Sequence, residues 1–229
     1  MKDIALIDLT GVALTMRSLR IVRPASLTGR LGCGLALAAS LLVTQAALLP
    51  QALAEDDWLR SIPEFALSDQ AGVTHALGEY ADRDLIVLYV QGVGCPIARI
   101  AVPSYREVRA EFESKNVEFM MFNSNIQDNI PRIAREVDEF GIDFTVLKDE
   151  GQGLAKALGV ERTAEVFVVD PKTREVFYRG PINDKLGYET QKNNASANYL
   201  KDALNTVLAG AKVDMDDVPD SKGCLVAIF

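Results

Sequence analysis

Histidine is almost absent from this chain of 229 residues, and His75 is its only example. A single imidazole excludes metal sites that require several histidine ligands. It also argues against a catalytic pair of cysteine and histidine. The sequence contains no internal repeat, and nothing in it indicates a second domain.

Basic residues are scarce beyond the first 54 positions. The chain has 24 Lys and Arg against 32 Asp and Glu, and residues 55–229 retain 19 and 30 of these, a net charge of −11. Such acidity argues against nucleic acid or anionic lipid as a partner. The length of residues 55–229 fits one domain with a full core.

Residues 1–54 have the pattern of an export signal. An apolar stretch over residues 31–49 follows a basic part that contains Arg17, Arg20, Arg23 and Arg30. Ala52-Leu53-Ala54 then offers a cleavage site before Glu55. We therefore predict a signal peptide over residues 1–54 and an exported protein, in the periplasm or another extracytoplasmic compartment.

An uncleaved membrane anchor is the alternative for this segment, because about 20 apolar residues can span a bilayer. Gln45, Pro50 and Gln51 disfavour the anchor, and Cys33 lies too close to Arg30 for a lipoprotein site. Cleavage leaves Cys95 and Cys224 as the remaining cysteines. Two cysteines in an oxidising compartment can form one disulfide.

Cys95 stands at a predicted junction between a strand and a helix. The apolar run Leu85–Val90 leads into the loop of residues 91–94, then Cys95, Pro96 and a helical pattern. Proline suits the first turn of a helix. A cysteine at a helix start lies beside N–H groups whose partial positive charge favours the reactive thiolate. We therefore predict a reactive cysteine, with an inert buried cysteine as the alternative.

Strand-like and helix-like segments alternate along the chain, which predicts an α/β fold. We expect strands at residues 65–67, 74–77, 85–90, 117–122, 144–147, 166–169 and 176–178, and helices at 95–112, 129–140, 154–158 and 197–209. Pro103 should kink the first helix, and Asp128 can cap the second. The acidic residues 211–229 form a tail that carries Cys224.

Several short motifs accompany this order of elements. They are Ile62-Pro63-Glu64-Phe65-Ala66-Leu67, Gly94-Cys95-Pro96, Asn123-Ser124-Asn125, Arg162-Thr163-Ala164-Glu165-Val166-Phe167-Val168-Val169-Asp170, Tyr178-Arg179-Gly180 and Gly223-Cys224. Together they resemble the thioredoxin fold and, within it, the redoxin or peroxiredoxin-like family of the alkyl hydroperoxide reductase and thiol-specific antioxidant type. The resemblance implies a mixed central sheet of about five strands with helices on both faces, in a domain over residues 55–210 followed by the tail 211–229.

The resemblance also implies thiol-based redox chemistry with no metal or organic cofactor. Cys95 would be the nucleophile that attacks a peroxide or a disulfide, and Cys224 would resolve the oxidised form. Arg162 and Thr163 are the nearest substitutes for the arginine that peroxiredoxins hold against the sulfur. Reducing equivalents would come from a partner thiol protein, such as a thioredoxin-like electron donor.

The chain departs from the family patterns at positions that bear on the reaction. Ala98 stands where thioredoxins have a second cysteine, and Arg99 where copper-delivering relatives have theirs. Gly92 replaces the Thr or Ser of peroxiredoxins, and Ala164 replaces the cis-proline of thioredoxins. We expect a trans bond before Ala164, because a cis bond without proline costs about 3 kcal/mol.

A different class of function accounts for the same cysteines. A permanent disulfide between Cys95 and Cys224 would close a loop of about 130 residues and stabilise the fold by about 5 kcal/mol in the chain-entropy model. The alternative is therefore a non-catalytic binding or assembly module with a structural disulfide. The corresponding simple role for Arg162 is a solvated ion pair with Glu161 or Glu165.

Overall fold

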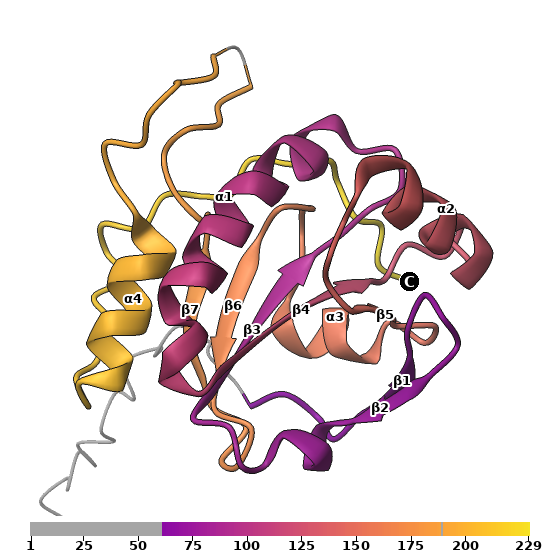
Figure 1. Cartoon of the computed structure of the whole chain (residues 1–229), viewed down its shortest axis with the longest axis horizontal. Coiled ribbons are helices and arrows are strands. Elements are labelled where there is room, and N and C mark those ends of the chain that lie inside the picture. Colours follow the sequence, from indigo (N-terminus) through magenta and orange to yellow (C-terminus); the bar gives the residue numbers. More distant parts are fainter. Residues whose placement is uncertain (1–60, 189) are drawn as a thin grey trace, which may run out of the picture. The chain divides into compact units, whose positions relative to one another are not determined.

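The computed structural model describes residues 61–188 and 190–229 (Figure 1). The predicted signal segment, residues 1–54, lies outside these ranges. Within them, none of the helices has the length and apolar character needed to cross a membrane.

A small hairpin opens the described part of the chain, as the sequence predicts. Strands β1 (Ala66–Ser68) and β2 (Thr74–Ala76) pair antiparallel. The carboxylate of Asp69 accepts hydrogen bonds from the backbone N–H groups of Ala71 and Val73, at 2.8 and 2.9 Å. An aspartate that satisfies the backbone of its own turn in this way fixes the direction of the hairpin. The short helix η1 (Leu77–Tyr80) follows.

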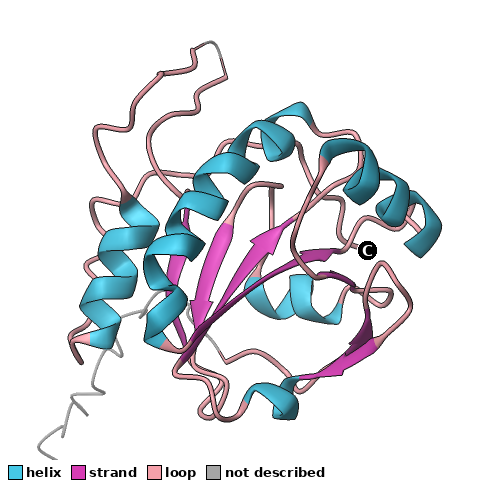
Figure 2. Cartoon of the chain, viewed as in Figure 1, coloured by secondary structure: helices cyan, strands magenta, loops and turns pink. Residues whose placement is uncertain are grey.

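The core of the domain is one mixed sheet. Its strands are β3 (Leu85–Val90), β4 (Val117–Asn123), β5 (Val146–Lys148), β6 (Val166–Val169) and β7 (Val176–Gly180), in the spatial order β5-β4-β3-β6-β7. Strand β3 is parallel to β4 and antiparallel to β6, as Figure 2 shows by the arrow directions. The predicted five-stranded mixed sheet is confirmed. Central strand β3 is buried along its whole length, because both faces of the sheet are covered.

The helices cover both faces of this sheet. They are α1 (Pro96–Phe112), α2 (Ile130–Phe140), α3 (Gly153–Leu158) and α4 (Tyr199–Leu208), with a short turn of helix, η2 (Glu113–Lys115), after α1. Successive side chains of a strand point to opposite faces. Val87 and Tyr89 of β3 therefore pack with residues of α1 and α4, whereas Ile86 and Leu88 pack with residues of α3.

Two details of the helices concern the sequence predictions. Helix α1 runs through Pro103 as one element. Helix α2 begins after Asn129, whose extended backbone places its side chain to accept a hydrogen bond from the N–H of Arg132 at 3.0 Å. The prediction that Asp128 caps α2 is therefore wrong, because Asp128 lies one residue before the N-cap. Its buried carboxylate instead accepts a hydrogen bond from the loop before α1.

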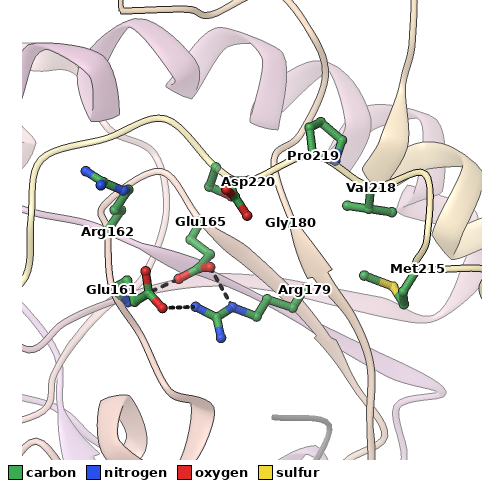
Figure 3. Close-up of a pocket in the computed structure, with 10 residues that line it drawn as sticks. Glu161, Arg162, Glu165, Arg179, Gly180, Met215, Val218, Pro219 and Asp220 are labelled. Atoms are coloured by element: carbon green, nitrogen blue, oxygen red, sulfur yellow. Dashed lines mark hydrogen bonds and ion pairs between the residues drawn. The ribbon is translucent and has the colours of Figure 1, made fainter. Parts of the chain in front are cut away.

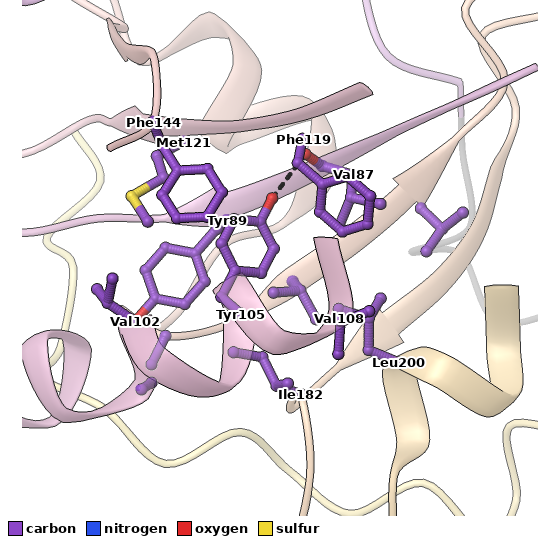
Figure 4. Close-up of a cluster of buried hydrophobic side chains, with 14 of the residues drawn as sticks. Val87, Tyr89, Val102, Tyr105, Val108, Phe119, Met121, Phe144, Ile182 and Leu200 are labelled. Carbon is purple, nitrogen blue, oxygen red and sulfur yellow. Dashed lines mark hydrogen bonds between the residues drawn. The ribbon is translucent and has the colours of Figure 1, made fainter. Parts of the chain in front are cut away.

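Tyr105 joins α1 to the two central strands (Figure 4). Its side chain is fully buried, and its hydroxyl lies 2.9 Å from the carbonyl oxygen of Val87 and 3.0 Å from that of Met120. The ring packs against Phe144, with centroids 4.8 Å apart. A buried hydroxyl needs such partners, because an unpaired polar group in the core destabilises the fold.

We predict that Tyr105→Phe lowers the free energy of unfolding by about 1 kcal/mol, the usual contribution of one buried hydrogen bond. Urea unfolding of the oxidised protein measures the change. Tyr199→Phe is the control, because the Tyr199 hydroxyl has no hydrogen-bond partner among the described residues, and its removal should change stability by less than about 0.5 kcal/mol. Equal stability of the Tyr105→Phe variant and the parent would contradict the structural role of the hydroxyl.

Candidate active site

Cys95 lies immediately before α1, at the helix start that the sequence predicts. It is the N-cap residue with extended backbone angles, and Pro96 follows in the first turn. Its N–H donates to the carbonyl of Gly92 at 3.2 Å, and its carbonyl accepts the first helical hydrogen bond, from Arg99 at 3.1 Å. The side chain is 4% exposed. The sulfur therefore lies at the positive end of a long helix, where a thiolate is stabilised.

Cys95 and Cys224 form a disulfide within the chain. Their Cα atoms lie 6.2 Å apart, an ordinary distance for a bridged pair, although 129 residues separate them in sequence. The C-terminal tail, yellow in Figure 1, runs back over the fold to make this contact possible.

The tail is held by its main chain as well as by the disulfide. Thr163 donates its N–H to the carbonyl of Cys224, and Val226 donates its N–H to the carbonyl of Glu161, both at 2.9 Å. Leu225 thereby forms an antiparallel bridge with Arg162. The side chain of Val226 is buried in the core on the α3 face, while that of Leu225 points to solvent. Residues 224–226 thus run antiparallel to the segment 161–163 and pair with it through one isolated bridge.

Thr163 connects the two cysteines through its hydroxyl. The oxygen accepts a hydrogen bond from the N–H of Cys224 at 3.0 Å and lies 3.0 Å from the sulfur of Cys95. In the disulfide this sulfur carries no proton, so the hydroxyl is the donor of the second contact. The same hydroxyl can donate to a Cys95 thiolate, and a hydrogen bond to the charged form favours that form. Thr163 is the predicted site residue that the structure brings into direct contact with both cysteines.

Glycines on either side make room for Thr163. A Cβ atom on Gly223 would lie 1.8 Å from the carbonyl oxygen of Thr163, so any side chain there must displace the tail. A Cβ atom on Gly92 would lie 2.7 Å from the methyl carbon of Thr163. The departure at Gly92 therefore has a local cause: Thr163 occupies the space that a larger residue at position 92 would need.

Arg162 contacts the tail. Its guanidinium donates to the carbonyl of Gly223 at 3.4 Å and lies 5.8 Å from the ring centre of Tyr188. These contacts include neither the Cys95 sulfur, near which Arg162 was predicted to act, nor the alternative ion pair with Glu161 or Glu165. Arg179 takes that place, 2.7 Å from the carboxylate of Glu165 and 3.9 Å from that of Glu161.

These charged groups line a cavity of about 460 Å³ beneath the tail (Figure 3). Met215, Val218 and Asp220 of the tail form its other wall. Burial raises the pKa of Glu165, and the guanidinium of Arg179 opposes this shift. The ion pair between them joins β7 to the residue that precedes β6.

Buried carboxylates hold the loop that leads to Cys95. Asp128 accepts hydrogen bonds from the N–H of Val93 at 3.0 Å and from the side-chain amides of Asn123 and Asn125. Glu136 pairs with Arg99 at 2.6 Å and lies 3.4 Å from the N–H of Gly94. Neither role is among the sequence predictions. The cluster Asn123-Ser124-Asn125 was the available signal, because polar residues that follow a buried strand require partners.

The bond before Ala164 is trans, as predicted, since the described residues contain no cis peptide bond. Ala164 has a φ of +62°, in the left-handed region that residues with a side chain rarely adopt. Its N–H donates to the carbonyl of Val90 at 2.8 Å. This contact sets the segment 161–164 against the end of β3, next to Cys95. The described residues contain no group of three or more side chains arranged to hold a metal ion.

A family model and several solved structures match the chain. The model of the Redoxin family matches residues 60–196. A hypothetical protein from Sinorhizobium meliloti is similar in structure, with a TM-score of 0.60 and 25% identity over 72% of this chain and 91% of that one. An uncharacterized conserved protein from Geobacillus kaustophilus gives 0.59 and 23% over 74% and 91%. Peroxidoxin BcpB from Mycobacterium tuberculosis gives 0.46 and 18% over 66% and 92%. None of the curated proteins matches the chain.

We predict that Gly223→Ala weakens the Cys95–Cys224 disulfide, because the added methyl group meets the carbonyl of Thr163. Equilibration with reduced and oxidised glutathione should show at least a roughly tenfold lower equilibrium constant for the disulfide, which corresponds to about 1.4 kcal/mol. Gly78→Ala is the matched control, since a Cβ atom there meets nothing within 4 Å. Equal equilibrium constants for the two variants would show that the close approach at Gly223 is unimportant.

Proposed function

Because the chain belongs to the Redoxin family, we propose that it is a thiol-dependent oxidoreductase in which Cys95 attacks and Cys224 resolves. Family membership supports thiol redox chemistry in general. The observation that carries the finer proposal is the disulfide between a cysteine at a helix start and a cysteine on a docked tail, with the Thr163 hydroxyl at both. Such an arrangement supplies a stabilised thiolate and a second thiol in reach of it.

With a peroxide, the Cys95 thiolate attacks one peroxide oxygen and the O–O bond breaks. The sulfur loses two electrons and becomes a sulfenic acid, and the other oxygen leaves as alcohol or water after it takes a proton. The Cys224 thiolate then attacks the Cys95 sulfur, so that the S–S bond forms, the S–O bond breaks, and the hydroxide takes a proton from solvent and leaves as water. Gly92 stands where peroxiredoxins have a Thr or Ser and has no side chain to contact the sulfur. The hydroxyl of Thr163, which lies at the Cys95 sulfur, supports the reaction in its place.

With a disulfide substrate, the Cys95 thiolate attacks one substrate sulfur and expels the other as a thiolate. Cys224 then attacks the Cys95 sulfur of the mixed disulfide and releases the second substrate thiolate. Both routes end in the Cys95–Cys224 disulfide. A dithiol of a partner protein, such as a thioredoxin-like electron donor, would return the two electrons. Export, as the sequence of residues 1–54 predicts, would place this cycle in an oxidising compartment.

A non-catalytic module with a structural disulfide is the second candidate. The burial of Cys95 favours it, and so do the main-chain hydrogen bonds that fix Cys224. The two candidates differ in reduction potential. A structural disulfide has a potential below about −300 mV, and an exchangeable one lies well above that value.

The first test is the intact mass of the fully reduced chain after brief exposure to stoichiometric hydrogen peroxide. We expect rapid loss of two hydrogens in the parent, because Cys224 closes the disulfide on oxidised Cys95. The Cys224→Ser variant should stop at the sulfenic acid or a more oxidised form, and the Cys95→Ser variant should not react rapidly.

The same samples treated with a small aromatic disulfide separate the two substrates. Oxidation by peroxide no faster than that of a free thiol would remove peroxidase activity from the proposal. If neither reaction occurs and Cys95→Ser is identical to the parent in every thiol assay, the non-catalytic module with a structural disulfide is the remaining candidate.

We further predict that Thr163→Val slows the reaction of Cys95 with iodoacetamide at pH 7 about tenfold and shifts its pH dependence upward. A hydrogen bond to a charged group contributes about 1.5–3 kcal/mol, and valine keeps the shape of threonine without the hydroxyl. Measured in a Cys224→Ser background, Thr163→Ser should retain the parent rate. Identical pH profiles for the valine and serine variants would refute a role for the hydroxyl.

A further inference from the structure

The end of the tail is bound by a side chain that the proposed chemistry leaves unused. Gln152, between β5 and α3, is 2% exposed. Its amide nitrogen donates to the carbonyl of Ala227 at 2.7 Å, and its amide oxygen accepts from the N–H of Phe229 at 2.9 Å. One side chain thus satisfies a donor and an acceptor of the tail, much as a neighbouring strand would.

The position of Gln152 is set by its own unusual backbone. Its φ is +57°, in the left-handed region, and it forms the N-cap of α3. A residue with a side chain pays about 1 kcal/mol for this conformation. The carboxylate of Asp149 holds the turn by accepting hydrogen bonds from the N–H groups of Leu154 and Ala155. The turn therefore presents the amide of Gln152 to the tail in a fixed direction.

The attachment is made by the main chain of the tail. The side chains of Leu225 and Phe229 are 73% and 75% exposed, so they add little to the binding. Val226 is the buried exception. Beyond Cys224, the tail is therefore held by the pairing with Glu161, by Val226 and by Gln152. None of these contacts requires the disulfide.

Gln152 also belongs to the polar network that holds the Cys95 loop. Its amide nitrogen donates to the carbonyl of Ser124 at 2.9 Å. The next residue, Asn125, donates to Asp128, whose carboxylate accepts the N–H of Val93. The loop of one cysteine and the tail of the other are thus supported from the same buried turn at residues 123–125.

We propose that Gln152 is a positioning residue that keeps the tail docked when the disulfide opens, so that Cys224 stays beside Cys95. The inference rests on the proposed function and adds to it the contact that makes the attack of Cys224 on oxidised Cys95 fast within one chain. A thiol on a free, flexible tether reaches an effective concentration in the millimolar range. A docked tail exceeds this value, because the orientation of the attacking sulfur is fixed before the reaction.

The test compares Gln152→Ala with the parent in the full-length chain. One assay follows the first reaction of Cys95 with a small aromatic disulfide, and a second follows closure of the Cys95–Cys224 disulfide from that adduct. A third measures the glutathione equilibrium of the disulfide. We expect the closure rate and the equilibrium constant to fall about tenfold, the loss expected for ordinary hydrogen bonds. The first rate should fall less than the closure rate, because Gln152 contacts the tail directly but reaches the Cys95 loop only through Ser124. Gln127→Ala, at an exposed glutamine, should match the parent in all assays.

A double-mutant cycle shows whether Gln152 acts through the tail. A chain that ends after Val226 lacks both tail partners of the amide and should lose closure rate to the same extent as Gln152→Ala. Combining the two changes should cause no further loss. An additional loss in the truncated chain, or equal slowing of the first reaction and of closure, would overturn the proposal in favour of a structural role. If Cys95 of the parent fails to react with the small disulfide, the proposed function fails. The glutathione equilibrium still tests whether Gln152 keeps the tail docked.

Discussion

The pairing of the tail with residues 161–163 is the contact on which the site depends. Strands β3 and β6 are neighbours in the sheet, and hydrogen bonds between Val90, the last residue of β3, and residues 164–165 extend their pairing to the segment that precedes β6. This places Thr163 beside the start of α1. The tail then aligns with Thr163, so Cys224 reaches a sulfur that it follows by 129 residues. The order of the strands in the sheet therefore determines where the two cysteines meet.

The fold followed from local patterns in the sequence. Alternating apolar runs and helical stripes located the strands and helices, and the apolar run before Gly94-Cys95-Pro96 located Cys95 at a helix start. These predictions succeeded because each depends on residues close together in the chain. The bounds of β5 and α4 shifted by a few residues, since they are short and end in loops.

The contacts inside the site were less accessible to sequence analysis. For Arg162 the sequence left two roles open, a substitute for the sulfur-facing arginine and an ion pair with Glu161 or Glu165, but Arg179 of the neighbouring strand reaches those carboxylates instead. Thr163 was considered as a substitute for an arginine, whereas its hydroxyl itself contacts sulfur. Asp128 supports a loop 35 positions earlier in the chain. Each of these contacts joins separate segments, so no local pattern could specify it.

The long separation of the two sulfurs bears on how the protein is made. Cys95 leaves the ribosome, and in an exported chain crosses the membrane, well ahead of Cys224. The surface that receives the tail forms only after β6 has paired with β3, because Thr163 and Glu161 belong to the segment that leads into β6. Once cleavage has removed residues 1–54 and with them Cys33, a growing chain carries Cys95 as its one thiol, and any disulfide it forms in that interval joins it to another molecule. The Cys95–Cys224 disulfide therefore forms in a chain whose sheet is already complete.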